Sequence, residues 1–317
     1  MIHRTALFVG AFLATAGIVM LLGGNAAVAT VVDQLLRLWP LAIIAIGIGL
    51  LLRRTRWALV GTLVAAIIPG LLLGGVVLAA PDMASLCERD EAGPRTSGAG
   101  HFGAPATVDL SLSCGEMTVR TVAGTGWQLE TSAMDHGQAV VDATTDHLSV
   151  ASPDGNWRYR FGREGDAWQL GLPTGVPLDI DAEIDAGRGS FDLAGADIGQ
   201  LLVEVNAGDA VLDLTSATVD QLDLEVNAGA ASIRLPAGSD LTGDLTVSAG
   251  SIELCVPDGL GIRIHGDVAF GATSFDGLVR VGDAWETPDY PSMTNQADLS
   301  VTASAGSVVV DPQGGCK

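Results

Sequence analysis

Apolar and polar residues alternate through residues 178–277, and the whole pattern returns every 21 residues. Alternation of this kind is typical of strands that bury one face. Overlaying the repeats gives five apolar columns: Ile180, Leu201 and Leu222; Ala182, Val203, Leu224 and Leu245; Ile184, Val205, Val226 and Val247; Phe191, Leu212, Ile233, Leu254 and Phe275; and Leu193, Leu214, Leu235 and Val256. One repeat cannot bury its apolar face alone. The pattern therefore predicts a single-stack β-solenoid of strand-turn-strand repeats, with a closely related ladder of hairpins as the alternative.

A turn of small residues marks the middle of each repeat. Its glycines stand 21 residues apart, at Gly187, Gly208, Gly229, Gly250 and Gly271. Glycine supplies the positive φ that such turns require. Two positions earlier is a ladder of short polar residues, Asp185, Asn206, Asn227 and Ser248, which can bond their own backbone or the equivalent residue of the next repeat. We interpret both columns as structural, with a ligand-binding row as the alternative for the ladder.

The repeat becomes irregular at both ends. Further strands are expected within 106–119, 138–152 and 157–172, and atypical first repeats are expected to cap the stack. After Gly271, the polar residues 283–296 predict a loop inserted into one repeat. The turn pattern then returns at Gly306.

The first 80 residues show long apolar runs in place of alternation. They predict a transmembrane domain with spans at about 6–23, 36–52 and 57–80, because a helix needs about 20 apolar residues to cross a bilayer. Arg53, Arg54 and Arg56 lie between the second and third spans, and the positive-inside rule places them and the N-terminus in the cytoplasm. The rest of the chain is then extracytoplasmic. Alternatively, the first span is a cleaved signal sequence, since residues 27–29 resemble a cleavage site.

Charge divides the chain at the same point. Residues 1–80 carry a net charge of +4, whereas residues 81–317 carry −25. We interpret residues 81–104 as a polar tether and residues 105–317 as an acidic domain kept soluble by self-repulsion. The acidity excludes nucleic acid as a partner, because no basic stripe is present to neutralise phosphates.

The sequence contains no motif for hydrolytic, phosphate-binding or zinc chemistry, so we predict a non-enzymatic protein without a cofactor. Its most suggestive polar group is a pair of carboxylate columns: Glu183, Glu204 and Glu225, and beside them Asp181, Asp223 and Asp244. Neighbouring strands lie about 4.8 Å apart, so these charges repel unless water or a cation separates them. We interpret the columns as a solvated outer face. Ca²⁺ bridging and acid–base catalysis on a polysaccharide are the alternatives.

All four cysteines, Cys87, Cys114, Cys255 and Cys316, follow the predicted spans. An even number of cysteines in an exported region predicts disulfides, and four cysteines allow three connectivities, which the sequence leaves open. No Cys-x-x-Cys spacing is present, so a metal site is not predicted.

Two resemblances follow from these motifs. The segment 38–54 begins Leu-Trp-Pro, continues as a span punctuated by glycine and ends at Arg53-Arg54, and it resembles the membrane domain of LiaI- and LiaF-like bacterial proteins. The domain with Val-Asn-Ala-Gly turns resembles the toastrack-type β-solenoid of putative adhesins and of the C-terminal part of LiaF-like proteins. The first resemblance implies a response to cell-wall-active antibiotics, commonly by restraint of a membrane sensor kinase, and it brings no catalytic residues.

We therefore expect a multi-pass protein of the bacterial cell membrane whose partners are the lipid bilayer and either a membrane sensor kinase or an envelope component. The first functional hypothesis is an accessory that senses or regulates cell-envelope stress. The alternative is a surface adhesin-like or structural envelope protein, and a third hypothesis is a carbohydrate-active enzyme. The sequence predicts no oligomeric state.

Overall fold

The computed structural model describes residues 95–103, 105–132, 138–153, 165–268, 272–275 and 277–311. All of them belong to the second of two compact units, Met83–Lys317. The predicted spans with Arg53, Arg54 and Arg56 lie outside the described residues, as do Cys87, Gly271 and Cys316. Within the described part of the chain, no helix has both the length and the apolar character needed to cross a bilayer.

The described residues form 19 strands and one short 3-10 helix, η2 (Tyr290–Ser292). The strands are β1 (Arg95–His101), β2 (Ala106–Leu112), β3 (Gly115–Val122), β4 (Gly126–Ser132), β5 (Val140–Ala143), β6 (His147–Ala151), β7 (Asp166–Pro173), β8 (Leu178–Ile184), β9 (Gly187–Asp192), β10 (Asp197–Val205), β11 (Gly208–Asp213), β12 (Thr218–Arg234), β13 (Leu241–Cys255), β14 (Leu260–Val268), β15 (Ala272–Phe275), β16 (Val279–Val281), β17 (Ala284–Glu286), β18 (Asn295–Ala303) and β19 (Ser307–Asp311).

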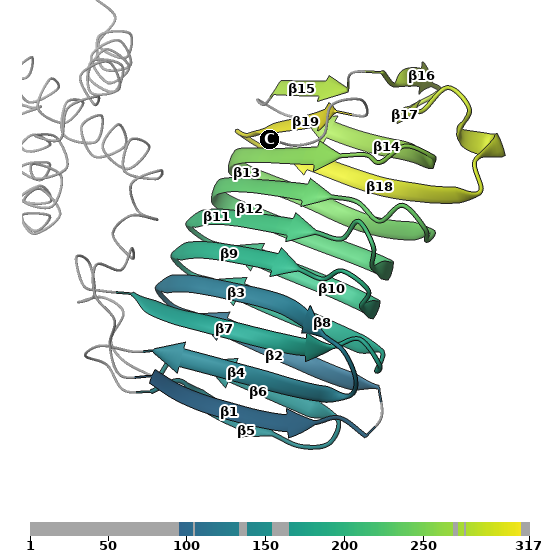
Figure 1. Cartoon of the computed structure of the whole chain (residues 1–317). Helices are drawn as coiled ribbons and strands as arrows, with labels where there is room; N and C mark the ends of the chain where they lie inside the picture. The colour runs from purple at the N-terminus through teal and green to yellow at the C-terminus, as the bar shows by residue number, and fades with distance from the viewer. Residues whose placement is uncertain are drawn as a thin grey trace, which may run out of the picture. The chain divides into compact units, whose positions relative to one another are not determined.

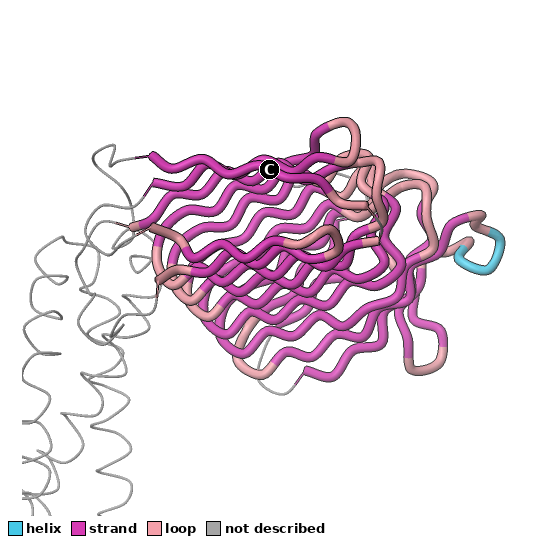
Figure 2. Tube along the Cα trace, turned by 90° about the horizontal axis from the view of Figure 1, so that it is seen from below, coloured by secondary structure: helices cyan, strands magenta, loops and turns pink. Residues whose placement is uncertain are grey.

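Each repeat forms one turn of a coil, here called a rung, and contributes a strand to each of two walls (Figure 1). Strands β8 and β10 and the first parts of β12 and β13 belong to the first wall, and β9, β11 and the second parts of β12 and β13 to the second. Pairing between these rungs is parallel and in register, so that Leu201 lies between Ile180 and Leu222. Figure 2 shows the two layers, with η2 projecting to one side. The predicted all-β, solenoid-like fold is confirmed.

The predicted apolar columns meet between the two walls. None of their members is more than 7% exposed except Phe275, which is partly buried against the same core. Full burial of one aliphatic side chain contributes roughly 1.5–3 kcal/mol, and each column places such side chains next to one another on neighbouring rungs. The stack, and not the single rung, is therefore the stable unit.

The turn glycines lie side by side along one edge of the stack. Gly208 pairs with Gly187 on one side and with Gly229 on the other, and their φ angles are between +132° and +142°. A Cβ atom added to Gly208 would lie 1.9 Å from the carbonyl oxygen of Gly187. The turn therefore requires glycine both for its backbone conformation and for the close approach of the next rung. Gly306 lies beside Gly250 but does not have a positive φ.

The C-terminal repeats do not stack in chain order. The strands of the last repeat, β18 and β19, pair directly with β13, and β14 and β15 pair on their outer side. Phe275 consequently lies beside Val310 and not beside Leu254, which corrects the expected order of that column. Part of the predicted loop 283–296 forms strand β17, which pairs antiparallel with the outer edge of β14.

The physical reason lies at the outer edge and not in the inward side chains, since β14 buries Leu260, Ile262 and Ile264 as fully as β18 buries Leu299 and Val301. The outer edge of β14 pairs with the short strand β17, and Arg263 Nε of β14 lies 2.8 Å from Glu286 Oε1 of β17. This pairing covers the last edge of the stack, so β14 suits the outer position, while β18 and β19 pair with a strand on each side.

The N-terminal repeats are interleaved in the same way. Strands β2 and β3 pair with β8 and β9, while β6 and β7 pair on the outer side of β2 and β3. Antiparallel strands then close this end, with β5 on β6, β4 on β7 and β1 on β4. The repeat 106–122, expected among the caps, is therefore an interior rung. We call this arrangement, in which the first and last repeats each lie between two other rungs, the interleaved ends.

Candidate functional site

Carboxylates cover the outer surface of the first wall, here called the acidic face. Glu183, Glu204 and Glu225 lie side by side in register, and Thr246 follows them. The neighbouring column contains Asp109, Asp181, Leu202, Asp223 and Asp244. Along β2, β8, β10, β12 and β13, no outward position of this wall carries Lys or Arg. The face is thus a regular acidic surface that extends over several rungs.

The polar turn ladder joins the glutamate column to the corner of the stack. Asn206 Nδ2 donates to Asp185 Oδ1 at 3.1 Å and to Glu183 Oε1 at 3.4 Å. One rung further, Asn227 Nδ2 donates to Asn206 Oδ1 at 2.9 Å and to Glu204 Oε1 at 3.4 Å. Each amide therefore supplies donors to the acidic rung beside it. This arrangement accounts for the ladder as a structural feature.

Crowding on the acidic face changes the pKa of two carboxyl groups. Burial raises the pKa of Glu204, and the neighbouring charges of Glu225 and Glu183 raise it further. Burial also raises the pKa of Asp181, with Asp109 adding to the effect. Ionisation of these groups therefore costs more in the folded stack than in water, and a cationic partner would relieve that cost.

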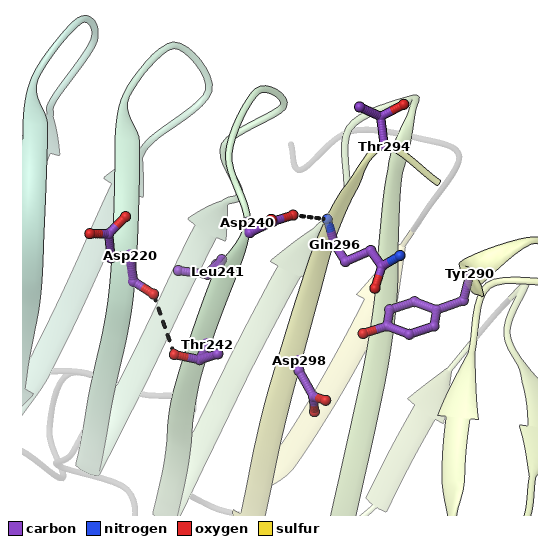
Figure 3. A pocket seen from close by; sticks show the side chains of 8 residues that line it. All are labelled: Asp220, Asp240, Leu241, Thr242, Tyr290, Thr294, Gln296 and Asp298. Atoms are coloured by element: carbon purple, nitrogen blue, oxygen red, sulfur yellow. Dashed lines mark hydrogen bonds between the residues drawn. The ribbon is translucent and has the colours of Figure 1, made fainter. Parts of the chain in front are cut away.

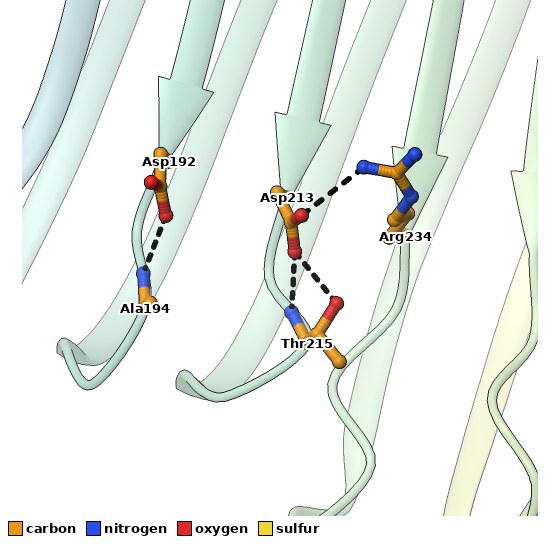
Figure 4. A network of polar contacts seen from close by, with 5 residues as sticks. All are labelled: Asp192, Ala194, Asp213, Thr215 and Arg234. Atoms are coloured by element: carbon orange, nitrogen blue, oxygen red, sulfur yellow. Dashed lines mark hydrogen bonds and ion pairs between the residues drawn. The ribbon is translucent and has the colours of Figure 1, made fainter. Parts of the chain in front are cut away.

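The outer surface of the second wall, here called the mixed face, carries charges of both signs side by side. One of its columns reads Arg120, Asp192, Asp213 and Arg234. Asp213 accepts hydrogen bonds from the Thr215 hydroxyl at 2.6 Å and the Thr215 N–H at 3.1 Å, and it pairs with Arg234 Nη1 at 3.1 Å (Figure 4). Burial alone would raise the pKa of Asp213, but these partners together lower it.

The described residues contain no group of three or more His, Cys, Asp or Glu side chains arranged to hold a metal ion. The carboxylate columns run in lines across the strands, one carboxylate from each rung, and do not converge on a point. Ca²⁺ requires six to eight oxygen ligands at 2.3–2.6 Å. The described part of the acidic face therefore does not support the alternative of Ca²⁺ bridging.

Cys114 and Cys255 are both disulfide-bonded. Cys255 lies beside Arg234, and the column continues through Asp213 and Asp192 to Arg120, so four rung spacings separate β13 from β3. At about 4.8 Å for each spacing this is roughly 19 Å, far beyond the reach of a disulfide. The register therefore excludes a bond between Cys114 and Cys255, and with it one of the three connectivities.

Sequence reasoning did not place the last repeat on the acidic face. Asp298 and Thr302 of β18 lie beside Thr242 and Thr246 of β13 and extend the acidic face by one rung. The return of the turn pattern at Gly306 was the available signal for a further rung. It could not show that this rung inserts between β13 and β14.

One comparison with known proteins agrees with this geometry. A family model described as "N-terminal domain of toast_rack, DUF2154" matches residues 104–236, which supports a toastrack-type fold for this part of the chain. A search of curated proteins finds no match.

The solved structures that are similar to the chain include two with adhesion-type descriptions. One is a "putative cell adhesion protein" from Clostridium sporogenes, 14% identical, with a TM-score of 0.49, over 69% of this chain and 100% of that one. The other is a "putative adhesin" from Bacteroides fragilis, 13% identical, with a TM-score of 0.27, over 71% of this chain and 99% of that one.

Proposed function

We propose that this protein acts by binding and not by catalysis, as an adhesion-type protein of the bacterial envelope. In this proposal the three predicted spans anchor the chain in the cell membrane, and the stack faces the outside. The acidic face is the contact surface, and its partner is an envelope or surface component that carries positive charge. The toastrack-type fold is consistent with this role.

The observation that carries the proposal is the difference between the two outer faces. Both walls share one backbone geometry, yet only the first presents rows of carboxylates without basic residues between them. A surface of one charge sign attracts and orients a partner of the opposite sign. The mixed face neutralises its own carboxylates locally, as Asp213 and Arg234 do, and has less charge to offer.

The proposal can be tested with cells that display the full-length chain, measured for attachment to amine-coated and hydroxyl-coated surfaces. A variant with Glu183→Gln, Glu204→Gln and Glu225→Gln should attach to the amine coating several-fold less well than the parent. The matched control, Glu116→Gln with Asp209→Asn and Glu253→Gln, removes three charges from the mixed face and should attach normally. Equal losses in both variants, or no loss in the first, would refute the proposal.

A second candidate function is regulation of a partner within the membrane. It is favoured by the Leu-Trp-Pro segment at 38–40 and the Arg53-Arg54 end of the predicted second span, which resemble LiaF-like proteins. In this candidate the stack senses the state of the envelope and the spans restrain a sensor kinase. Replacing the spans with an unrelated anchor separates the two candidates, because adhesion should survive the exchange and regulation should not.

A further inference from the structure

A hollow opens on the acidic face near the C-terminal end of the stack, between β12, β13, β18 and the segment that contains η2. We call it the terminal hollow and define it by Asp220, Asp240, Thr242, Tyr290, Gln296 and Asp298 (Figure 3). Its volume is about 510 Å³, within the range of roughly 300–1,000 Å³ that is usual for small-molecule sites. A second lobe, which contains Asp244 and His265, shares Thr242 and Asp298 with it.

Tyr290 places a polar group at the end of this hollow. Tyr290 is only 5% exposed, and the Arg263 guanidinium stacks on its ring at 4.4 Å from the centroid. Among the hydrogen bonds between described residues, none involves its hydroxyl. Figure 3 shows that hydroxyl directed into the space between Gln296 and Asp298. The ring is buried while the hydroxyl opens onto the hollow, where it can exchange hydrogen bonds with a ligand.

The surrounding groups are held in place by the fold. Asp240 Oδ1 accepts the backbone N–H of Gln296 at 2.9 Å, and the Thr242 hydroxyl donates to the Asp220 carbonyl at 3.3 Å. Gln296 Nε2 donates to the Met293 carbonyl at 3.2 Å, so its amide oxygen remains available as an acceptor. These contacts fix the lining before any ligand arrives.

The lining is rich in acceptors and negative in charge. Asp220, Asp240 and Asp298 contribute three carboxylates, and Asp298 lies 3.5 Å from both Arg263 Nη1 and His265 Nε2. Arg263 is shared with Glu286, so the lining keeps a net negative charge. Carboxylates only accept hydrogen bonds, so a fitting ligand must bring donors and positive charge. The carboxylates do not converge as metal ligands anywhere in the described chain. We therefore expect an organic cation whose other polar groups can meet the Tyr290 hydroxyl and the Gln296 amide oxygen.

We propose that the terminal hollow binds an amino sugar, a hexosamine unit with a free ammonium group. The ammonium supplies three donors and one positive charge to the carboxylates. The sugar hydroxyls exchange hydrogen bonds with Tyr290, Thr242 and the amide oxygen of Gln296. Burial raises the pKa of Tyr290 despite the neighbouring Arg263, so the hydroxyl keeps its proton and is available as a donor.

The test is calorimetric titration of the purified full-length chain in nanodiscs with the glucosamine disaccharide, its N-acetylated form and cellobiose. The free amine should bind at least tenfold more tightly than the other two sugars. Tyr290→Phe keeps the ring beneath Arg263 and removes only the hydroxyl, and it should weaken binding about tenfold. Asp220→Asn should weaken binding similarly. Asp209→Asn, on the mixed face, is the matched control and should have no effect.

Several outcomes would overturn the proposal. They are the absence of amine binding, equal affinity for the three sugars, unchanged affinity in Tyr290→Phe, and equal binding of lysine methyl ester, which carries the ammonium without the sugar. The inference does not depend on the proposed adhesion. The variant that replaces Glu183, Glu204 and Glu225 should still bind the amino sugar, so failure of either idea is distinguishable from failure of the other.

Discussion

The acidic and mixed faces are two outer surfaces of one repeat, and their carboxylates behave in opposite ways. On the acidic face burial and like charges raise the pKa of Glu204, whereas on the mixed face Thr215 and Arg234 lower the pKa of Asp213. The inward columns are nearly identical from rung to rung. The difference shows that the repeat constrains the inward side chains and the turn glycine. The charges of the outward side chains can differ from one face to the other.

The largest expected loss of stability comes from a substitution in the glycine turn that joins the two faces. Gly208→Ala would place a Cβ 1.9 Å from the Gly187 carbonyl at a φ of +142°, so we expect a loss of about 3 kcal/mol or more in the free energy of unfolding. Thermal unfolding of the purified full-length chain, followed by tryptophan fluorescence, measures this loss. Gly238→Ala is the control, because nothing lies within 4 Å of its added Cβ. Equal effects at both sites would contradict this account of the turn.

The mixed face should lose stability when one of its carboxylates is neutralised. Asp213→Asn removes the charge that pairs with Arg234 and weakens the hydrogen bonds from Thr215. At pH 7 we expect a loss of about 1 kcal/mol, small because both side chains are partly exposed. Urea unfolding would measure it, and an unchanged midpoint would show that Arg234 does not stabilise this column.

On the acidic face, neutralising a carboxylate should raise the stability of the fold instead of lowering it. Glu204→Gln removes a charge between Glu183 and Glu225 but keeps an oxygen that can accept from Asn227. We expect a gain of about 0.5 kcal/mol at pH 7, as for relief of like charges on adjacent strands. The same urea experiment tests this, and a loss of stability would mean that the amide ladder needs the ionised glutamate.

The smallest expected difference lies in the pH dependence of these two variants. The folded-state pKa of Glu204 is raised above its ordinary value of 4.5, so its ionisation destabilises the stack at neutral pH and acidification removes that effect. The folded-state pKa of Asp213 is lowered below 3.8, so its contribution persists to lower pH. On acidification from pH 7, the gain from Glu204→Gln should therefore vanish before the loss from Asp213→Asn. Unfolding curves at half-unit pH steps test the order.

The sequence predicted the rungs because period-2 alternation and a 21-residue interval both follow from local geometry. It placed Ile184 and Val205 in one column, and the structure pairs them directly. It could not predict the interleaved ends, because the choice between β14 and β18 as the neighbour of β13 depends on long-range pairing. The terminal hollow was missed for the same reason. Asp220 and Tyr290 line the same hollow only when β18 lies beside β13, and no repeated spacing in the sequence relates the two residues.

The interleaved ends set an order for how the domain is made. Synthesis supplies β14 and β15 before β18 and β19, yet the later pair occupies the position next to β13. Strands β14 and β15 therefore cannot take their final positions before β18 and β19 have been synthesised. If they paired with β13 earlier, they would occupy the position that β18 and β19 take in the folded domain. Completion of the stack waits for residue 311, and a nascent chain that is cut short before β18 would lack the terminal hollow.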